Sequence, residues 1–286
     1  MELMTKAKKN IILQTKDHLV SRNTFDIHWD ETKGRAWTDV QHLDTLDPFY
    51  DSSEYISHHS KPRSAIQGLY GVVRTLMFHY KYRLLMKNIP SQGRLLDVGC
   101  GTGAFLSFMK KKGLDVSGVE NNDKARKICH VNDLPVQPTT EGFPQKSFDL
   151  ITLWHVLEHL PHPEKHIASY KDLLQPGGIL VIAAPNFESH DRHHYKEDWA
   201  ALDVPRHLWH FTPKGLISMA KEKEFELIQK SFLPFDVFYI AYLSEKHKGK
   251  RIPLLRALVK ASFFSLKALF TAKHSSIVYL FRKPAP

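Results

Sequence analysis

The sequence predicts an α/β protein built on a doubly wound parallel sheet. Apolar, strand-like runs alternate with helix-like segments over residues 94–184, a pattern typical of a parallel sheet covered by helices. The first of these runs leads into a turn that contains Gly99, Gly101 and Gly103. Such glycines let the backbone approach a ligand, and the helix that follows offers free N–H groups. The sequence therefore predicts a small-molecule site at the carboxyl ends of the strands.

Two acids narrow the choice of ligand. Gly99, Gly101 and Ala104 satisfy a dinucleotide fingerprint, but Asp97 stands just before them and would repel a pyrophosphate. The same carboxylate would attract an ammonium or sulfonium group. Glu120 ends the next predicted strand, where an acid can bind ribose hydroxyls. Together the two acids favour a cationic adenosyl ligand.

Four motifs in order resemble the class I S-adenosylmethionine-dependent methyltransferases. They are the glycine turn (96–103), the ribose motif (119–121), the fourth-strand motif (147–160) and the turn into strand five (174–180). The resemblance covers roughly the last two thirds of the chain and points to the branch that acts on quinone precursors and other small molecules. It implies a Rossmann-like seven-stranded sheet, whose last strand inserts antiparallel, and S-adenosylmethionine as cofactor.

The resemblance also assigns the cofactor contacts. The glycines and Asp97 would approach the methionine part, and Glu120 would hold the ribose diol. The full predicted set is Asp97, Gly99, Cys100, Gly101, Gly103, Glu120, Asn121, Leu153, Trp154, His155 and, from a lid, Tyr55. Thr139 and Thr140 stand where the family usually has an acid beside the adenine, which leaves adenine recognition open.

The remaining elements follow in order along a predicted methyltransferase domain, residues 66–286. Apolar positions at helical spacing predict a long helix over 66–87. Asn88 and Pro90 are expected to end it. The predicted strands cover residues 95–97, 115–120, 134–138, 148–153, 179–184, 225–232 and 276–282. The predicted intervening helices begin near residues 104, 122, 164 and 213.

Residues 1–65 are predicted to form a β and lid appendage. The alternation within residues 16–29 predicts a short hairpin. Similar methyltransferases often carry a zinc ribbon here, but this chain has no cysteine before Cys100, so we expect an appendage without metal ligands. Tyr55 and His58 lie in an aromatic, serine-rich segment that is either a lid over the cofactor or a packed linker.

Composition limits the class of protein. The net charge is +10, but the basic clusters are separate and have no interleaved aromatic residues, so nucleic acid is not the expected partner. Cys100 and Cys129 cannot form a disulfide framework. Without an apolar signal core or a long uncharged run, we expect a cytoplasmic protein, with peripheral membrane contact as an alternative.

His155, Glu158 and His159 follow the fourth strand at i, i+3 and i+4. On a helix this spacing places all three on one face, where two imidazoles and a carboxylate could bind a metal. Quinone-precursor methyltransferases carry Glu-x-x-Glu-His here and can hold a divalent ion, but His155 replaces the first glutamate. We favour the interpretation that these three residues support the wall of the cofactor pocket, and we expect no metal.

The acceptor side is assigned to two later segments. Residues 185–212 form a predicted long loop, rich in histidine and aromatic residues, that should wall the acceptor pocket. His207 is the first candidate for a general base, with His194 and His210 behind it and His155 on the cofactor side. The alternative is that residues 206–207 only anchor the loop.

The insertion 234–274 is predicted to be helical. Arg256, Lys260 and Lys267 fall on one narrow stripe, with leucines and phenylalanines over the rest of the helix. Such a helix could lie on a membrane surface, cover a hydrophobic acceptor, pack into the core or form a dimer contact. We favour packing or a lid, with membrane contact through residues 250–270 as the minority interpretation.

The sequence thus predicts methyl transfer to a small hydrophobic or ring-containing acceptor, with oxygen as the favoured atom. The open alternatives are a nucleic-acid methyltransferase, an NAD-dependent oxidoreductase and a non-catalytic protein that binds S-adenosylmethionine. The acceptor's identity and the oligomeric state are not written in the sequence.

Overall fold

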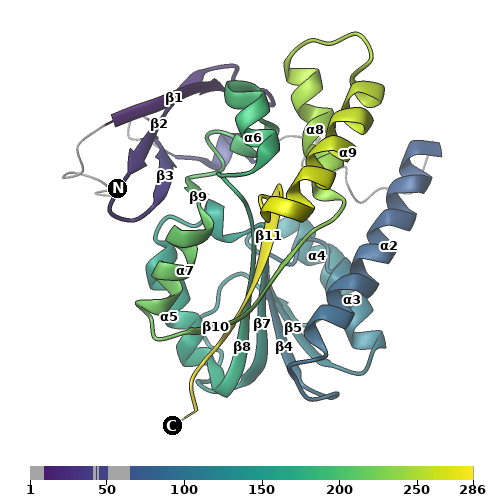
Figure 1. Ribbon diagram of the computed structural model, residues 1–286. Coiled ribbons are helices and arrows are strands. Elements are labelled where there is room, and N and C mark those ends of the chain that lie inside the picture. The colour runs from purple at the N-terminus through teal and green to yellow at the C-terminus, as the bar shows by residue number, and fades with distance from the viewer. Residues whose placement is uncertain (1–9, 41–42, 44, 51–64, 286) are drawn as a thin grey trace.

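A seven-stranded mixed sheet forms the centre of the protein. The computed structural model describes residues 10–40, 43, 45–50 and 65–285 (Figure 1). The strand order is β10-β11-β8-β7-β4-β5-β6. The strands are β4 (Arg94–Val98), β5 (Asp115–Val119), β6 (Val136–Gln137), β7 (Phe148–Trp154), β8 (Leu174–Pro185), β10 (Glu226–Phe232) and β11 (Ser276–Arg282). β11 runs antiparallel to both β8 and β10, while β4 to β8 pair in parallel, which confirms the predicted sheet.

Helices cover both faces of this sheet because its central strands are apolar on both sides (Figure 1). Leu96 and Leu153 pack toward one face, with α5 (Pro163–Leu173) and α7 (Pro213–Lys221). Leu95 and Leu150 pack toward the other. That second face is covered by α2 (Ala65–Leu85), α3 (Ala104–Lys111) and α4 (Asp123–Val131). Successive strand residues point to opposite faces, so each run fills two cores.

A second, smaller sheet is antiparallel and has the order β1-β2-β3-β9. The N-terminal part of the chain supplies β1 (Asn10–Lys16), β2 (Thr24–Asp30) and β3 (Arg35–Thr38). β1 and β2 form a hairpin, as predicted, but its first strand lies almost entirely before the predicted range 16–29, which holds the turn and most of β2. The fourth strand, β9 (Trp209–Phe211), comes from the segment that follows β8.

The expectation of a long irregular loop over residues 185–212 was therefore wrong. This segment contains α6 (His190–Tyr195), the 3₁₀ turns η4 (Lys196–Asp198) and η5 (Ala200–Leu202), and β9. Its aromatic residues, among them Trp199 and Phe211, are buried rather than lining an open wall. Further 3₁₀ turns are η1 (Asp47–Phe49) and η3 (Leu157–His159).

The predicted helical insertion is a hairpin of α8 (Asp236–His247) and α9 (Pro253–Thr271), which lies above the sheet in Figure 1. It shares a third hydrophobic core with the small sheet and with α6, through side chains such as Phe25, Tyr195, Ile240 and Phe264. In space, the predicted appendage and the predicted methyltransferase domain are thus joined by β9 and by this common core.

Candidate functional site

The glycine turn lies between β4 and α3, at the carboxyl edge of the large sheet. Gly99, Gly101 and Gly103 have φ values of +69°, +56° and +77°, in the left-handed region that favours glycine. A Cβ on Gly99 would lie 2.4 Å from Val156 Cγ2, and one on Gly103 would lie 2.4 Å from Leu134 Cδ1. The turn therefore needs glycine for its conformation and for its close packing.

We expect Gly99→Ala to destabilise the fold more than Gly113→Ala. Gly113 also has a positive φ, of +93°, but a Cβ there would meet nothing within 4 Å. Gly113→Ala, the control, should lower the free energy of unfolding only by the strain of alanine in a left-handed conformation, about 1–2 kcal/mol. Gly99→Ala adds the clash with the stiff Val156 side chain, about a further 1–3 kcal/mol. Denaturant unfolding of both variants checks this, and equal losses would contradict it.

Glu120 follows β5 and holds the glycine turn against the strand end. One of its carboxylate oxygens, Oε2, accepts a hydrogen bond from Gly101 N–H at 2.9 Å, and Oε1 accepts from Asn122 N–H at 2.8 Å. Each oxygen keeps a further lone pair that can accept from a hydroxyl group. Asn121, the neighbouring predicted residue, is exposed.

Asp97 lies near the end of β4 and is buried. Its Oδ1 accepts a hydrogen bond from Thr152 Oγ1 at 2.5 Å. Burial raises the pKa of Asp97 to about 7, against the hydrogen bond from Thr152 and the positive charge of Lys81. A cation placed beside this carboxylate would favour its ionised form.

A lysine that the sequence analysis did not single out reaches the same region from α2. Lys81 Nζ lies 3.8 Å from the ring centroid of Trp154 and 5.5 Å from that of Phe105. Burial lowers the pKa of Lys81 to about 8, while the charges of Asp236 and Asp97 oppose this. The site thus already holds an ammonium group on aromatic faces and near carboxylates, an arrangement suited to cationic ligands.

The sequence did contain a signal for this residue. Lys81 falls four residues after Met77 and four before Leu85, so it interrupts the apolar stripe of a helix whose other members pack into the core. Trp154 was predicted, and its buried Nε1 has no hydrogen-bond partner among the described residues. Leu153 and Cys100, also predicted, are buried, in β7 and in the glycine turn respectively.

His155 links the cofactor edge to the helical hairpin. It has a positive φ of +56°, its Nε2 lies 2.8 Å from Asp236 Oδ2, and its Nδ1 lies 3.3 Å from Glu158 Oε1. Although burial opposes it, hydrogen bonds to Asp236 and Glu158 raise the pKa of His155 to about 10. The ring is therefore an imidazolium at neutral pH, which suits a positioning role better than that of a proton acceptor.

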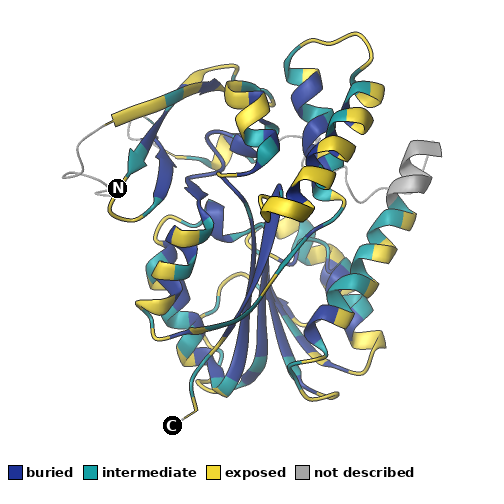
Figure 2. Ribbon diagram, in the orientation of Figure 1, coloured by how far each residue is buried: buried dark blue, intermediate teal, exposed yellow. Residues whose placement is uncertain are grey.

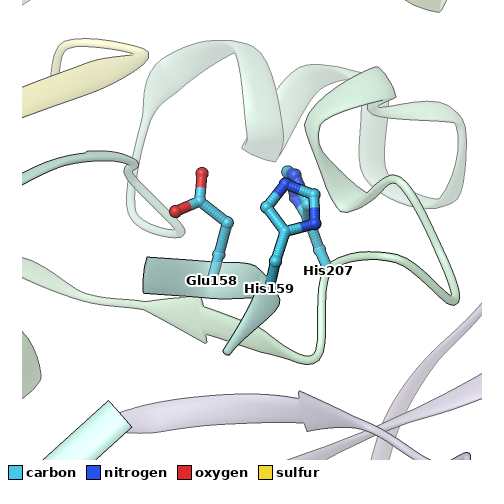
Figure 3. A group of neighbouring side chains, drawn as sticks. All are labelled: Glu158, His159 and His207. Carbon is cyan, nitrogen blue, oxygen red and sulfur yellow. The ribbon is translucent and has the colours of Figure 1, made fainter. Parts of the chain in front are cut away.

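The helical face expected over residues 155–159 is not formed. Residues 157–159 make a 3₁₀ turn, and the left-handed backbone at His155 precedes it. The structure instead brings together Glu158, His159 and His207, whose ligand atoms lie within 4.8 Å of one another (Figure 3). The rings of His159 and His207 meet edge to face, with centroids 4.6 Å apart.

The hydrogen bonds of this trio define its chemistry. His159 Nδ1 lies 3.0 Å from Arg206 O, and His207 Nδ1 lies 2.9 Å from Ala201 O. A carbonyl only accepts, so each Nδ1 carries the proton and each Nε2 keeps a lone pair. Glu158 Oε2 is buried without a hydrogen-bond partner among the described residues. Such a group can accept a proton or hold a divalent ion, and the absence of a metal stays a prediction.

Other predicted residues lie elsewhere. His194, on α6, contacts Lys260 Nζ at 2.9 Å and packs on Phe264, so its partners belong to α9. His210 pairs with Thr38 Oγ1 at 3.0 Å in the small sheet. Tyr55 and His58, the predicted lid, lie outside the described residues. Tyr50, nearby in sequence, does reach the site, with its hydroxyl 3.2 Å from His159 Nδ1.

A partly buried histidine, His247, and a buried one, His210, make stability depend on pH. His247 stacks on His18 with ring centroids 3.8 Å apart, and burial together with the charge of His18 lowers the pKa of His247 to about 4. Burial likewise lowers the pKa of His210 to about 3. In the unfolded chain both would titrate near pH ~6.5, so the unfolded state binds protons first as the pH falls.

We therefore expect the free energy of unfolding to decrease as the pH falls from about 6.5 to about 4. Denaturant unfolding at three pH values in that window measures the slope. His247→Gln should make the slope shallower, because it removes one of the protons that the unfolded state gains. An unchanged slope in this variant would contradict the assignment.

Known proteins share this architecture and sequence pattern. A family model for a methyltransferase domain matches residues 73–230, more than half of the chain. A ubiquinone biosynthesis O-methyltransferase of Saccharophagus degradans is 31% identical over 106 residues, which are 34% of this chain and 45% of that protein. Its counterpart in Actinobacillus pleuropneumoniae is 37% identical over 107 residues, 32% of this chain and 46% of that protein.

In both cases the match spans less than half the length of the curated relative. Among solved structures, a SAM-dependent methyltransferase from Archaeoglobus fulgidus superposes with a TM-score of 0.51 at 18% identity, covering 73% of this chain and 94% of that one. This likeness confirms the fold. With the matched domain family and the motifs at the carboxyl edge of the sheet, the chain belongs to the class I S-adenosylmethionine-dependent methyltransferases.

Proposed function

We propose that this enzyme transfers a methyl group to an oxygen atom of a small hydrophobic or ring-containing acceptor, with His207 as the general base. The observation that carries the proposal is the orientation of His207. Its Nδ1 donates to the Ala201 carbonyl at 2.9 Å, which leaves the lone pair on Nε2, and the ligand atoms of Glu158, His159 and His207 lie within 4.8 Å of one another. A base held in one tautomer by a third group is the arrangement that removes a proton from a hydroxyl.

The residues present fit S-adenosylmethionine. The glycine turn would approach its methionine part, because its backbone at Gly99, Gly101 and Gly103 turns sharply at the carboxyl edge of the sheet, just before the start of α3. Glu120 has lone pairs for the ribose hydroxyls, and Asp97 would face the positive charge. When bound, the cofactor supplies an electrophilic methyl group on a sulfonium. Trp154 adds an aromatic face and an Nε1–H donor that has no partner within the described part of the chain.

The chain's own contribution to the reaction would be positioning and proton removal. A bound acceptor must be held in line with the methyl group, which can account for most of the rate enhancement. Glu158 links the two halves of the site, because it accepts from His155 on the cofactor side and lies within 4.8 Å of the histidine pair on the other. The distant relatives that methylate oxygen in ubiquinone biosynthesis support this choice of atom and acceptor class.

The test is an acceptor screen that measures S-adenosylhomocysteine release from a panel of phenols, catechols and hydroxylated lipids. With a productive acceptor, His207→Gln should lower kcat by about 10²–10⁴-fold. His194→Gln is the matched control, since its contacts lie with α9, and should retain activity. Products found only in nucleic acid or protein, or a loss at His194 alone, would overturn the proposal.

A further inference from the structure

Helix α9 has two unlike faces. The face toward the protein carries small residues and one ring: Ala257, Ala261, Phe264 and Ala268. The opposite face carries large apolar side chains that are between 47% and 85% exposed: Leu254, Leu255, Leu258, Val259, Phe263, Leu266, Leu269 and Phe270. Figure 2 shows this outer face as a nearly continuous exposed band. Packing or a lid was favoured for this insertion; packing of these large side chains into the core was wrong, and a lid stays a prediction.

An exposed patch of this kind is uncommon in a protein that remains free in water. By the 100° turn per helical residue, the exposed apolar side chains spread over about half of the circumference of α9. Their neighbour Ile252, in the turn before the helix, is also 57% exposed. Among the described residues, none of the helices has the length and apolar character needed to span a bilayer. The patch therefore suits contact along the helix rather than insertion across a membrane.

The charges around the patch are of one sign. Residues 246–273 contain eight lysines and arginines and no aspartate or glutamate. Arg256 Nε and Lys260 Nζ each lie 2.6 Å from a carboxylate oxygen of the buried Glu245, so they fasten α9 to α8. The other basic residues include exposed ones on the hairpin: Lys246 in the last turn of α8, Lys250 and Arg251 before α9, Lys267 on α9 and Lys273 after it.

We propose that the outer face of α9 docks on the surface of a lipid bilayer that contains anionic lipid. An apolar face bordered by basic residues is the chemistry of a helix that lies in the plane of a membrane, with the apolar side chains below the headgroups. The basic residues would meet the lipid phosphates. A second copy of the chain is a poorer occupant, because a symmetric contact through this face would bring two acid-free basic surfaces together.

The docked hairpin would also connect the membrane to the active site. Asp236, the first residue of α8, accepts the hydrogen bond from His155 at 2.8 Å. A site next to the bilayer could take a hydrophobic acceptor from it, a consequence that rests on the proposed function. Docking itself does not depend on any acceptor, so its test is a binding measurement without one.

The experiment is flotation of the full chain with vesicles of phosphatidylcholine alone or with about 30% phosphatidylglycerol, in low and high salt. The test variant is Phe263→Gln with Phe270→Gln, at side chains that are 61% and 85% exposed. The matched control is Ile11→Gln with Val131→Gln, at side chains that are 54% and 84% exposed outside the hairpin. A third variant, Lys250→Gln with Arg251→Gln and Lys267→Gln, removes charge without touching the apolar face.

We expect the wild type and the matched control to float with the anionic vesicles, and the phenylalanine variant to bind at least tenfold more weakly. The charge variant should lose about fivefold for each charge removed, on anionic vesicles only. Wild type that stays unbound on both vesicles would overturn the proposal. So would phenylalanine and control variants that bind equally. A wild-type dimer in light scattering that becomes a monomer in the phenylalanine variant would assign the face to a second copy instead.

Discussion

Replacing Arg206 by alanine is expected to destabilise the protein by about 3–5 kcal/mol, because it leaves the buried carboxylate of Asp17 and the partly buried carboxylate of Asp203 without this partner. The Arg206 side chain is 1% exposed, and its Nη2 donates to Asp17 Oδ1 at 3.1 Å and to Asp203 Oδ1 at 2.7 Å. Asp17 is itself fully buried in the turn between β1 and β2. One guanidinium thus ties the small sheet to the segment before β9.

The matched control for this prediction is Arg94→Ala. Arg94 pairs with Asp149 at 3.7 Å, but its side chain is 40% exposed, so its loss should cost less than about 1 kcal/mol. Denaturant unfolding at neutral pH compares the two variants. If both variants lower the free energy of unfolding equally, the ion pairs of Arg206 do not stabilise the fold more than an exposed pair does. A variant with lysine at position 206 should recover only part of the loss, because an ammonium cannot donate to both carboxylates in the fork geometry.

The large sheet and the glycine turn could be predicted because their signals are local. Each buried strand is an apolar run, and the turn after β4 requires glycine wherever φ is positive. The order of the motifs then determined the topology through the family resemblance. Each strand and the glycine turn can be predicted from a short stretch of sequence, because none of them depends on contacts with distant parts of the chain.

The features that were missed depend on segments that are far apart in the chain. β9 is three residues long and is a strand only because β3, more than 170 residues earlier, pairs with it. The trio of Glu158, His159 and His207 forms because the turn at residues 157–159 is 3₁₀ and not α-helical, which no spacing rule could reveal. Lys81 comes from α2, which precedes the motifs in the sequence, and Asp236 comes from α8, which follows them. Both reach the cofactor edge of the sheet only in the folded protein.

The two faces of α9 were predicted only in part. The sequence showed the stripe of Arg256, Lys260 and Lys267, which binds Glu245 through its first two members. It did not show which apolar face would be buried, because leucine and phenylalanine are the usual core residues. Here the alanines face the protein, since helices α8 and α9 pack closely, and the large side chains are left outside.

Replacing Glu120 by glutamine is expected to weaken the binding of S-adenosylhomocysteine by about 100-fold, because two effects add. The carboxylate accepts from both Gly101 N–H and Asn122 N–H, and an amide can accept from only one of them. The remaining backbone N–H would face an NH₂ group, which distorts the glycine turn. The ribose hydroxyls would also lose a charged acceptor, and a hydrogen bond to a charged group contributes about 1.5–3 kcal/mol.

Isothermal titration with S-adenosylhomocysteine measures this effect directly and requires no acceptor. Glu226→Gln is the control, because that glutamate is exposed at the start of β10, away from the turn. Glu120→Asp keeps the charge but shortens the side chain by one methylene, which withdraws the carboxylate from both backbone donors and from the ribose, so this variant should also bind more weakly than the wild type. Binding of the Glu120→Gln variant within about threefold of the wild type would contradict the assignment, since a difference that small is under 1 kcal/mol. In that case the glycine turn alone, and not the acid after β5, would determine the affinity for the cofactor.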